Sequence, residues 1–167
     1  MSAATDWLAV KFPSFRRLRN EEIEAISDFT LLWSLYEQAI LNLDGNPTSI
    51  YNAAIEIMDN EDLLPAEFER AIEYFQDRYI ANGTFNAHFE SLNFRTRDRR
   101  QLVEAVLIGE AESAGRRLAA LLLIVYRLRN NLFHGQKWET GFRDQYSNFQ
   151  TANSVLKSCI DRHLLEV

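Results

Sequence analysis

The sequence has few of the residues that form turns and disulfides. Its 167 residues include six glycines, three prolines and one cysteine, Cys159. A single cysteine has no partner within the chain, which excludes an intrachain disulfide and suits a reducing compartment, so we expect a cytoplasmic protein. The scarcity of turn formers favours long helices over many short strands.

The sequence also lacks a long apolar segment. The longest purely apolar run, residues 118–126, has nine residues, whereas a membrane-spanning helix needs about 20. No basic start followed by a hydrophobic block occurs in the first twenty residues, so we expect neither a membrane span nor a signal peptide. Hydrophobic residues at 47% and charged residues at 25% are typical of a globular chain. We predict one domain over residues 1–167, with residues 1–19 as a loosely ordered N-terminal arm.

Positive charge is scarce in the first part of the chain. Residues 1–94 carry 6 basic and 16 acidic side chains, whereas residues 95–167 carry 12 and 8, within a net charge of −6. The acidic total argues against a broad nucleic-acid-coating surface, but a basic zone after residue 94 could hold phosphates. The alternative is that the charges lie on solvated helix faces.

Apolar residues recur every three or four positions through most of the chain, which indicates helices. We predict a first long helix capped by Asn20 and stopped by residues 44–47. Further helices are expected over residues 48–58, from Pro65 to the Asn82–Gly83 turn, over 97–133 and over 142–164. Thr96 is the expected cap of the fourth helix, which should break at Gly109 or Gly115, and residues 85–92 form at most a helical turn. No stretch alternates with period two, so the predicted class is all-α.

Residues 118–126 are apolar on all sides of the predicted helix. Such a segment belongs in the middle of a bundle or against another subunit. A small bundle cannot easily bury a helix that is apolar on every side. We therefore predict that part of this segment, or of the last helix, lies at a twofold interface of about 800 Å² or more per partner.

Most catalytic patterns are missing. The sequence has no His-Glu-x-x-His, no Cys-x-x-Cys, no phosphate-binding glycine loop and no serine between glycines. Three histidines and one cysteine do not suggest a transition-metal site. We therefore expect neither a bound metal nor a cofactor.

Residues 126–138 concentrate polar side chains where the most apolar helix should end. Asn130 and Asn131 are poor helix formers, and Gly135 suits the left-handed residue that closes a helix. Residues five apart lie about 140° apart around a helix. Arg129 and His134 therefore share a face only if the backbone leaves the helix between them, which a fraying or capped end allows. The alternative interpretation is that these polar residues only satisfy free carbonyls at the helix end.

The string RNNLFHG, with Arg129-Asn130-x-x-x-His134 at its core, resembles the Arg-x4-6-His signature of the HEPN superfamily. These are all-α domains of ribonuclease toxins, abortive-infection proteins and the nuclease halves of some CRISPR effectors. Residues 29–37 (FTLLWSLYE) carry a weaker similarity to the first helix of some members. The resemblance implies an antiparallel helical bundle with extra short helices, and a homodimer in which the two motifs face each other.

The resemblance also implies a function: a metal-independent endoribonuclease of a prokaryotic defence or stress system. In this interpretation His134 transfers protons, Arg129 clamps phosphate, and Asn130 orients one of them or the RNA. RNA cleavage without metal needs a proton acceptor, a proton donor and a cation beside the phosphorus, and a twofold axis would supply two histidines. The alternatives are an inactive HEPN module that binds RNA, a nucleotide or a protein partner, and a structural dimer without an RNA role.

One departure from the family concerns regulation. HEPN toxins neutralised by a nucleotidyltransferase often carry a tyrosine two residues after the histidine, and this chain has Gln136 there. We therefore expect no modification at this position. An antitoxin or regulatory protein of another kind stays open as a partner.

Several residues outside the motif are candidates for substrate contact or support. Lys137 and Arg127 lie beside the motif, and Arg99 and Arg100 belong to the densest basic cluster, which either grips the RNA backbone or pairs with the acidic helix after Pro65. Lys137 could equally face only solvent, and Trp138 either stacks on RNA or anchors its loop. Glu37 lies in an apolar stripe and needs a partner. That partner is Arg129, Arg127 or water.

Overall fold

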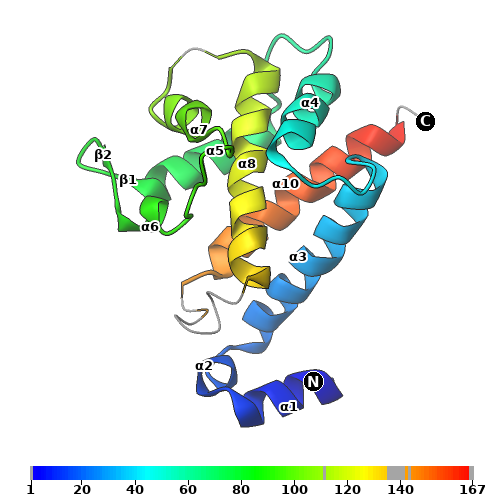
Figure 1. The fold of residues 1–167 in the computed structure, drawn as a ribbon, viewed down its shortest axis with the longest axis vertical. Coiled ribbons are helices and arrows are strands. Elements are labelled where there is room, and N and C mark those ends of the chain that lie inside the picture. The colour runs from blue at the N-terminus through cyan, green and yellow to red at the C-terminus, as the bar shows by residue number, and fades with distance from the viewer. Residues whose placement is uncertain (1, 111, 135–141, 143, 166–167) are drawn as a thin grey trace.

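The computed structural model describes residues 2–110, 112–134, 142 and 144–165, and it confirms the all-α class. The described elements are α1 (Ala3–Lys11), α2 (Pro13–Arg16), α3 (Asn20–Ala39), α4 (Pro47–Ile57), α5 (Ala66–Tyr79), β1 (Ile80–Ala81), β2 (Thr84–Phe85), α6 (Ala87–Glu90), α7 (Arg100–Leu107), α8 (Ala114–Phe133) and α10 (Tyr146–Leu165) (Figure 1). Among these residues, no helix is both long enough and apolar enough to cross a membrane.

Helix α8 runs through the centre of the molecule, with α4 packed along it and α10 crossing behind it toward α3 (Figure 1). Every side chain from Leu118 to Val125 is at most 1% exposed. Of the two predicted environments, the middle of a bundle is therefore the correct one. Residues 118–125 do not form the predicted twofold interface, because α4, α5, α7 and α10 pack against this segment within one chain. An interface on the last helix stays a prediction.

One of the two predicted helix breaks is correct. Gly109 has a φ of +82° and follows the end of α7, but Gly115 lies inside the first turn of α8. A Cβ at Gly115 would lie 2.9 Å from Cδ1 and 3.1 Å from Cα of Ile55 on α4. Gly115 thus allows two helices to approach closely instead of ending one.

The structure contains a small hairpin that the periodicity did not predict. Ile80 pairs with Phe85 and Ala81 with Thr84 across the Asn82–Gly83 turn, whose residues have φ values of 52° and 76°. Two positive φ values suit the tight turns of hairpins. Strands of two residues are too short for an alternating pattern.

The predicted helix caps are shifted. Asn20 is the first residue of α3 and Arg19 is its cap, with the Arg19 backbone N–H donating to Glu22 at 2.8 Å. Thr96 does not cap the fourth predicted helix, because α7 begins only at Arg100. The predicted N-terminal arm forms α1 and α2, and its Phe15 is buried against Phe142.

Candidate functional site

The predicted motif lies at the C-terminal end of α8. The helix ends at Phe133 and His134 is its C-cap, which confirms the prediction that the helix ends within this motif. The backbone N–H of His134 donates to the carbonyl of Asn130 at 2.9 Å, as in a regular helix. Regular helix therefore extends from Arg129 to Phe133 and ends at His134. Residues five apart on an ideal helix lie about 140° apart around its axis, and a common face for the two side chains stays a prediction.

Asn131 explains why the helix persists across two asparagines. Its side chain is buried, and Nδ2 donates to the carbonyl of Ser91 at 3.0 Å. A tertiary hydrogen bond to the segment before α7 thus offsets the weak helix propensity of asparagine.

Arg129 is half-buried between aromatic rings. Its guanidinium carbon lies 5.0 Å from the ring centre of Phe133 and 5.8 Å from that of Trp33 on α3. Nη1 donates to Oδ1 of Asn130 at 3.1 Å, and Asn130 is itself buried. These contacts hold the cation in one orientation, as an anion-binding arginine requires.

Two buried donors at this site have no acceptor among the described residues. They are Nε of Arg129 and Nε1 of the neighbouring Trp33. Buried polar groups normally have a hydrogen-bond partner, so these two donors are unsatisfied groups next to the end of α8.

His134 differs from Arg129 in its accessibility. It follows the last residue of α8, and its side chain is exposed. Histidine is the side chain that changes charge near neutral pH. The end of α8 therefore combines an oriented cation with an accessible group that can accept or donate a proton.

Arg127 has a structural role, which corrects its predicted contact with substrate. Its side chain is only 4% exposed; Nε donates to the carbonyl of Leu92 at 2.9 Å and Nη1 lies 3.0 Å from Oδ2 of Asp98. Burial lowers the pKa of Arg127, and the charge of Asp98 acts in the opposite direction. This arginine ties the segment before α7 to α8 and has no surface to offer RNA.

Glu37 does not support either arginine. Among the described residues it forms no ion pair with Arg129 or Arg127. Its carboxylate packs against Gly45, where an added Cβ would overlap Oε1. Of the alternatives for Glu37, the two arginines are therefore excluded, and a partly exposed position that reaches water fits its intermediate burial.

The basic cluster does not pair with the acidic helix α5. Arg100 binds Glu90 and Glu104, each at 2.7 Å, and its hydrogen bond to Glu90 lowers the pKa of that carboxyl. Arg99 is exposed and stacks 4.2 Å above the ring of Tyr51. Of the two candidates for substrate contact, Arg99 is therefore free of carboxylates in the described structure and Arg100 is neutralised.

The acidic residues of α5 use other partners. Glu69 pairs with Arg117 and Glu67 with Arg162. The candidates Lys137 and Trp138, together with Gly135 and Gln136, lie outside the described residues.

Sequence reasoning missed Trp33 and Phe133 as part of the site. Phe133 lies four residues after Arg129, which is the spacing of neighbours on a helix face. That spacing was an available signal. Trp33 lies in the apolar stripe of α3 and gave no signal beyond burial.

No protein-family model matches the chain, and neither the curated proteins nor the solved structures contain a significant match to it. The arrangement of its own residues therefore carries the functional argument.

Proposed function

We propose that the protein is a metal-independent endoribonuclease that cleaves RNA with Arg129 and His134 in a homodimer. The observation that carries the proposal is Arg129 itself. Its guanidinium is oriented by Asn130 and two aromatic rings, one of its buried donors lacks an acceptor, and the exposed His134 ends the same helix. This arrangement supports a phosphate clamp beside a proton-transfer group.

The reaction consistent with these groups is an internal transfer at phosphorus. A neutral imidazole of His134 takes the proton of the RNA 2′-hydroxyl, whose oxygen forms a bond to the phosphorus. The bond from phosphorus to the 5′-oxygen breaks, and a protonated imidazole gives its proton to that oxygen. Arg129 stabilises the charge that gathers on the phosphoryl oxygens. The products are a 2′,3′-cyclic phosphate and a 5′-hydroxyl.

A second protomer completes the proposed site. One histidine is not suited to both proton transfers, and the two motif side chains leave one helix about 140° apart. A twofold axis near the end of α8 would bring two arginines and two histidines to one cleft. Phe133, which is 51% exposed at this end, offers apolar surface for such a contact. The defence or stress setting, a cytoplasmic location and an antitoxin or regulatory partner belong to the proposal through the HEPN resemblance.

The test is cleavage of end-labelled RNA in the presence of EDTA. We expect wild-type activity to persist and Arg129→Ala and His134→Ala each to lower it by about 10²-fold or more, the scale of losing a transition-state charge partner or a general acid or base. Matched controls are Arg97→Ala and His88→Ala, which remove an exposed arginine and an exposed histidine elsewhere. Both controls should cleave like wild type.

Three outcomes would contradict the proposal in different ways. Wild-type protein that binds RNA without cutting it would favour an inactive binding module. Loss of cleavage in EDTA would indicate a metal-dependent reaction. Full activity in both motif variants would place the chemistry at other residues.

A further inference from the structure

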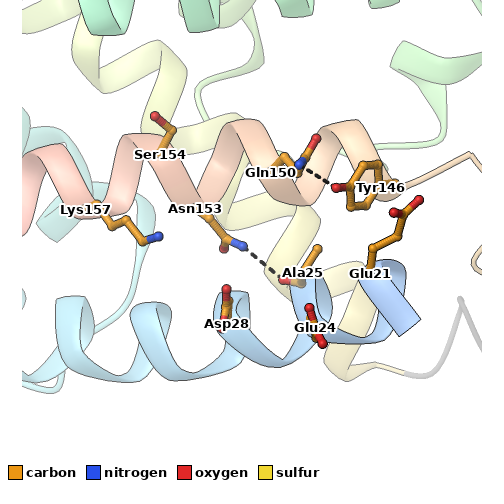
Figure 2. Close-up of a pocket in the computed structure, with 9 residues that line it drawn as sticks. All are labelled: Glu21, Glu24, Ala25, Asp28, Tyr146, Gln150, Asn153, Ser154 and Lys157. Carbon is orange, nitrogen blue, oxygen red and sulfur yellow. Dashed lines mark hydrogen bonds between the residues drawn. The ribbon is translucent and has the colours of Figure 1, made fainter. Parts of the chain in front are cut away.

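A polar groove lies between α3 and α10. Its volume is about 310 Å³, and the described residues that line it belong to α3 and α10 and include Glu21, Glu24, Ala25, Asp28, Asn153 and Lys157. Figure 2 shows Asp28 extending from α3 toward α10 and Asn153 extending from α10 into the space between the helices.

Asn153 forms the floor of this groove and has an unused acceptor. The residue is only 6% exposed, and its Nδ2 donates to the carbonyl of Ala25 at 3.0 Å. Its Oδ1 is buried and has no partner among the described residues. A buried acceptor of this kind needs a donor, and Asn153 is one of the residues that line the groove.

The groove wall carries carboxylates that the described structure leaves without ion pairs. Glu21 pairs with Arg19, but Glu24 and Asp28 are exposed and have no basic partner within the described ranges. Among the described residues, Lys157 is the single cation that lines the groove. The site therefore offers acceptors and negative charge, which suits a ligand that is both a donor and a cation.

The groove extends beyond this first hollow. A second hollow of about 330 Å³ shares Glu24 and Asp28 with it and continues toward Ser2, the N-cap of α1, and Thr5 of α1. Glu24 and Asp28 thus line both hollows. An extended ligand with more than one cationic group fits this geometry better than a compact one.

The lining also distinguishes among classes of cation. Within the described part of the chain, no three His, Cys, Asp or Glu side chains are grouped so that they could hold a metal ion. Protein interfaces have an apolar centre, whereas the lining of the first hollow is mostly polar. With a metal ion and a protein partner disfavoured, a small organic cation is the class of ligand that fits this lining.

We propose that this groove binds an aliphatic polyamine, with one ammonium group donating to Oδ1 of Asn153 and to Asp28, and a second ammonium beside Glu24. The inference is independent of the proposed RNA cleavage.

The experiment is calorimetric titration of the full chain with spermidine at low ionic strength, where exposed charges are least screened. We expect Glu24→Gln/Asp28→Asn to raise the Kd about tenfold, because each exposed ion pair contributes up to about fivefold. Lys157→Met should lower the Kd, since it removes the repelling cation. The matched control Glu56→Gln/Asp59→Asn changes the same charges outside the groove and should leave the Kd unchanged.

Asn153→Ala removes the unpartnered Oδ1 at the floor of the groove, and we expect it to weaken spermidine binding. If that variant fails to fold, the surface variants still decide the question. The proposal is overturned if spermidine does not bind wild type, if the groove and control variants bind equally, or if Mg²⁺ displaces spermidine at equal concentration.

Discussion

Cys159 is the only thiol of the chain and is completely buried in α10. Burial raises the pKa of this thiol to about 12, whereas an exposed cysteine titrates near 8.5. The folded state holds the proton more tightly than the unfolded state does. The resulting contribution to stability is complete below about pH 8.5 and is lost as the pH rises toward the folded pKa.

We therefore expect the free energy of unfolding to fall between about pH 9 and pH 10 by up to about 1.4 kcal/mol for each pH unit through Cys159. Urea unfolding followed by circular dichroism at several pH values measures this slope. Cys159→Ala should show a smaller slope over the same range. Equal slopes in both proteins would show that the thiol does not ionise on unfolding.

The correctly predicted residues depend on neighbours that are close in the sequence, whereas the wrongly predicted residues depend on contacts with distant segments. The helix-end position of Arg129 and His134 follows from their near neighbours, which the sequence displays. The role of Arg127 depends on Asp98, and that of Glu37 on its packing against Gly45. Such contacts depend on how separate segments fold together, which helical periodicity does not specify.

At the scale of elements, the contact between α4 and α8 depends on the missing side chain of Gly115. We expect Gly115→Ala to destabilise the protein by about 1–3 kcal/mol, because the added methyl group must displace Ile55. Alanine favours helices over glycine, so helix propensity alone predicts the opposite sign. Thermal unfolding of Gly115→Ala and wild type distinguishes the packing effect from the helix-propensity effect. A more stable variant would show that α4 and α8 can separate without cost.

The segment before α7 is joined to α8 by the buried pair of Arg127 and Asp98. We expect Asp98→Asn or Arg127→Met to lower stability by about 3–5 kcal/mol, because each leaves a buried charge without its partner. Arg97→Ala, which removes an exposed arginine of the same segment, should change stability by less than about 0.5 kcal/mol. Urea unfolding checks all three. Stable Arg127→Met with weakened RNA binding would restore the predicted substrate role.

Most of the helices could be predicted because their apolar faces are long and regular. The unpredicted features are those that depend on few residues or on another element. The β1–β2 hairpin is too short to show a period, and Gly115 continues a helix because α4 passes close to it. Arg99 occupies a left-handed conformation with a φ of 54°, which delays the start of α7.

At the scale of the whole molecule, the helices enclose α8, so the surface available for a second copy lies elsewhere. Exposed large apolar side chains include Phe133 beside Arg129, together with Leu31 and Leu35 on α3. Exposed apolar surface of this kind marks interaction sites when it is contiguous. With the middle of α8 excluded, the predicted places of the interface are the end of α8, where the resemblance implies facing motifs, and the last helix.

We expect light scattering to show a dimer, and Phe133→Asp to shift it toward the monomer by placing a charge in the apolar contact. Because Phe133 is 51% exposed, the variant should keep the thermal stability of wild type. Leu63→Asp, at a side chain that is 81% exposed before α5, is the matched control and should stay dimeric.

Cleavage should follow assembly, because the proposed reaction needs a neutral and a protonated histidine together. We expect the activity per protomer of wild type to fall on dilution in parallel with the dimer fraction, and the rate to peak between an acidic and an alkaline limb as the pH changes. Phe133 also contacts Arg129, so the dilution series separates loss of assembly from a displaced arginine. An active, concentration-independent monomer would show that one copy of Arg129 and His134 suffices, and that the roughly 140° between them on the helix is bridged within a single chain.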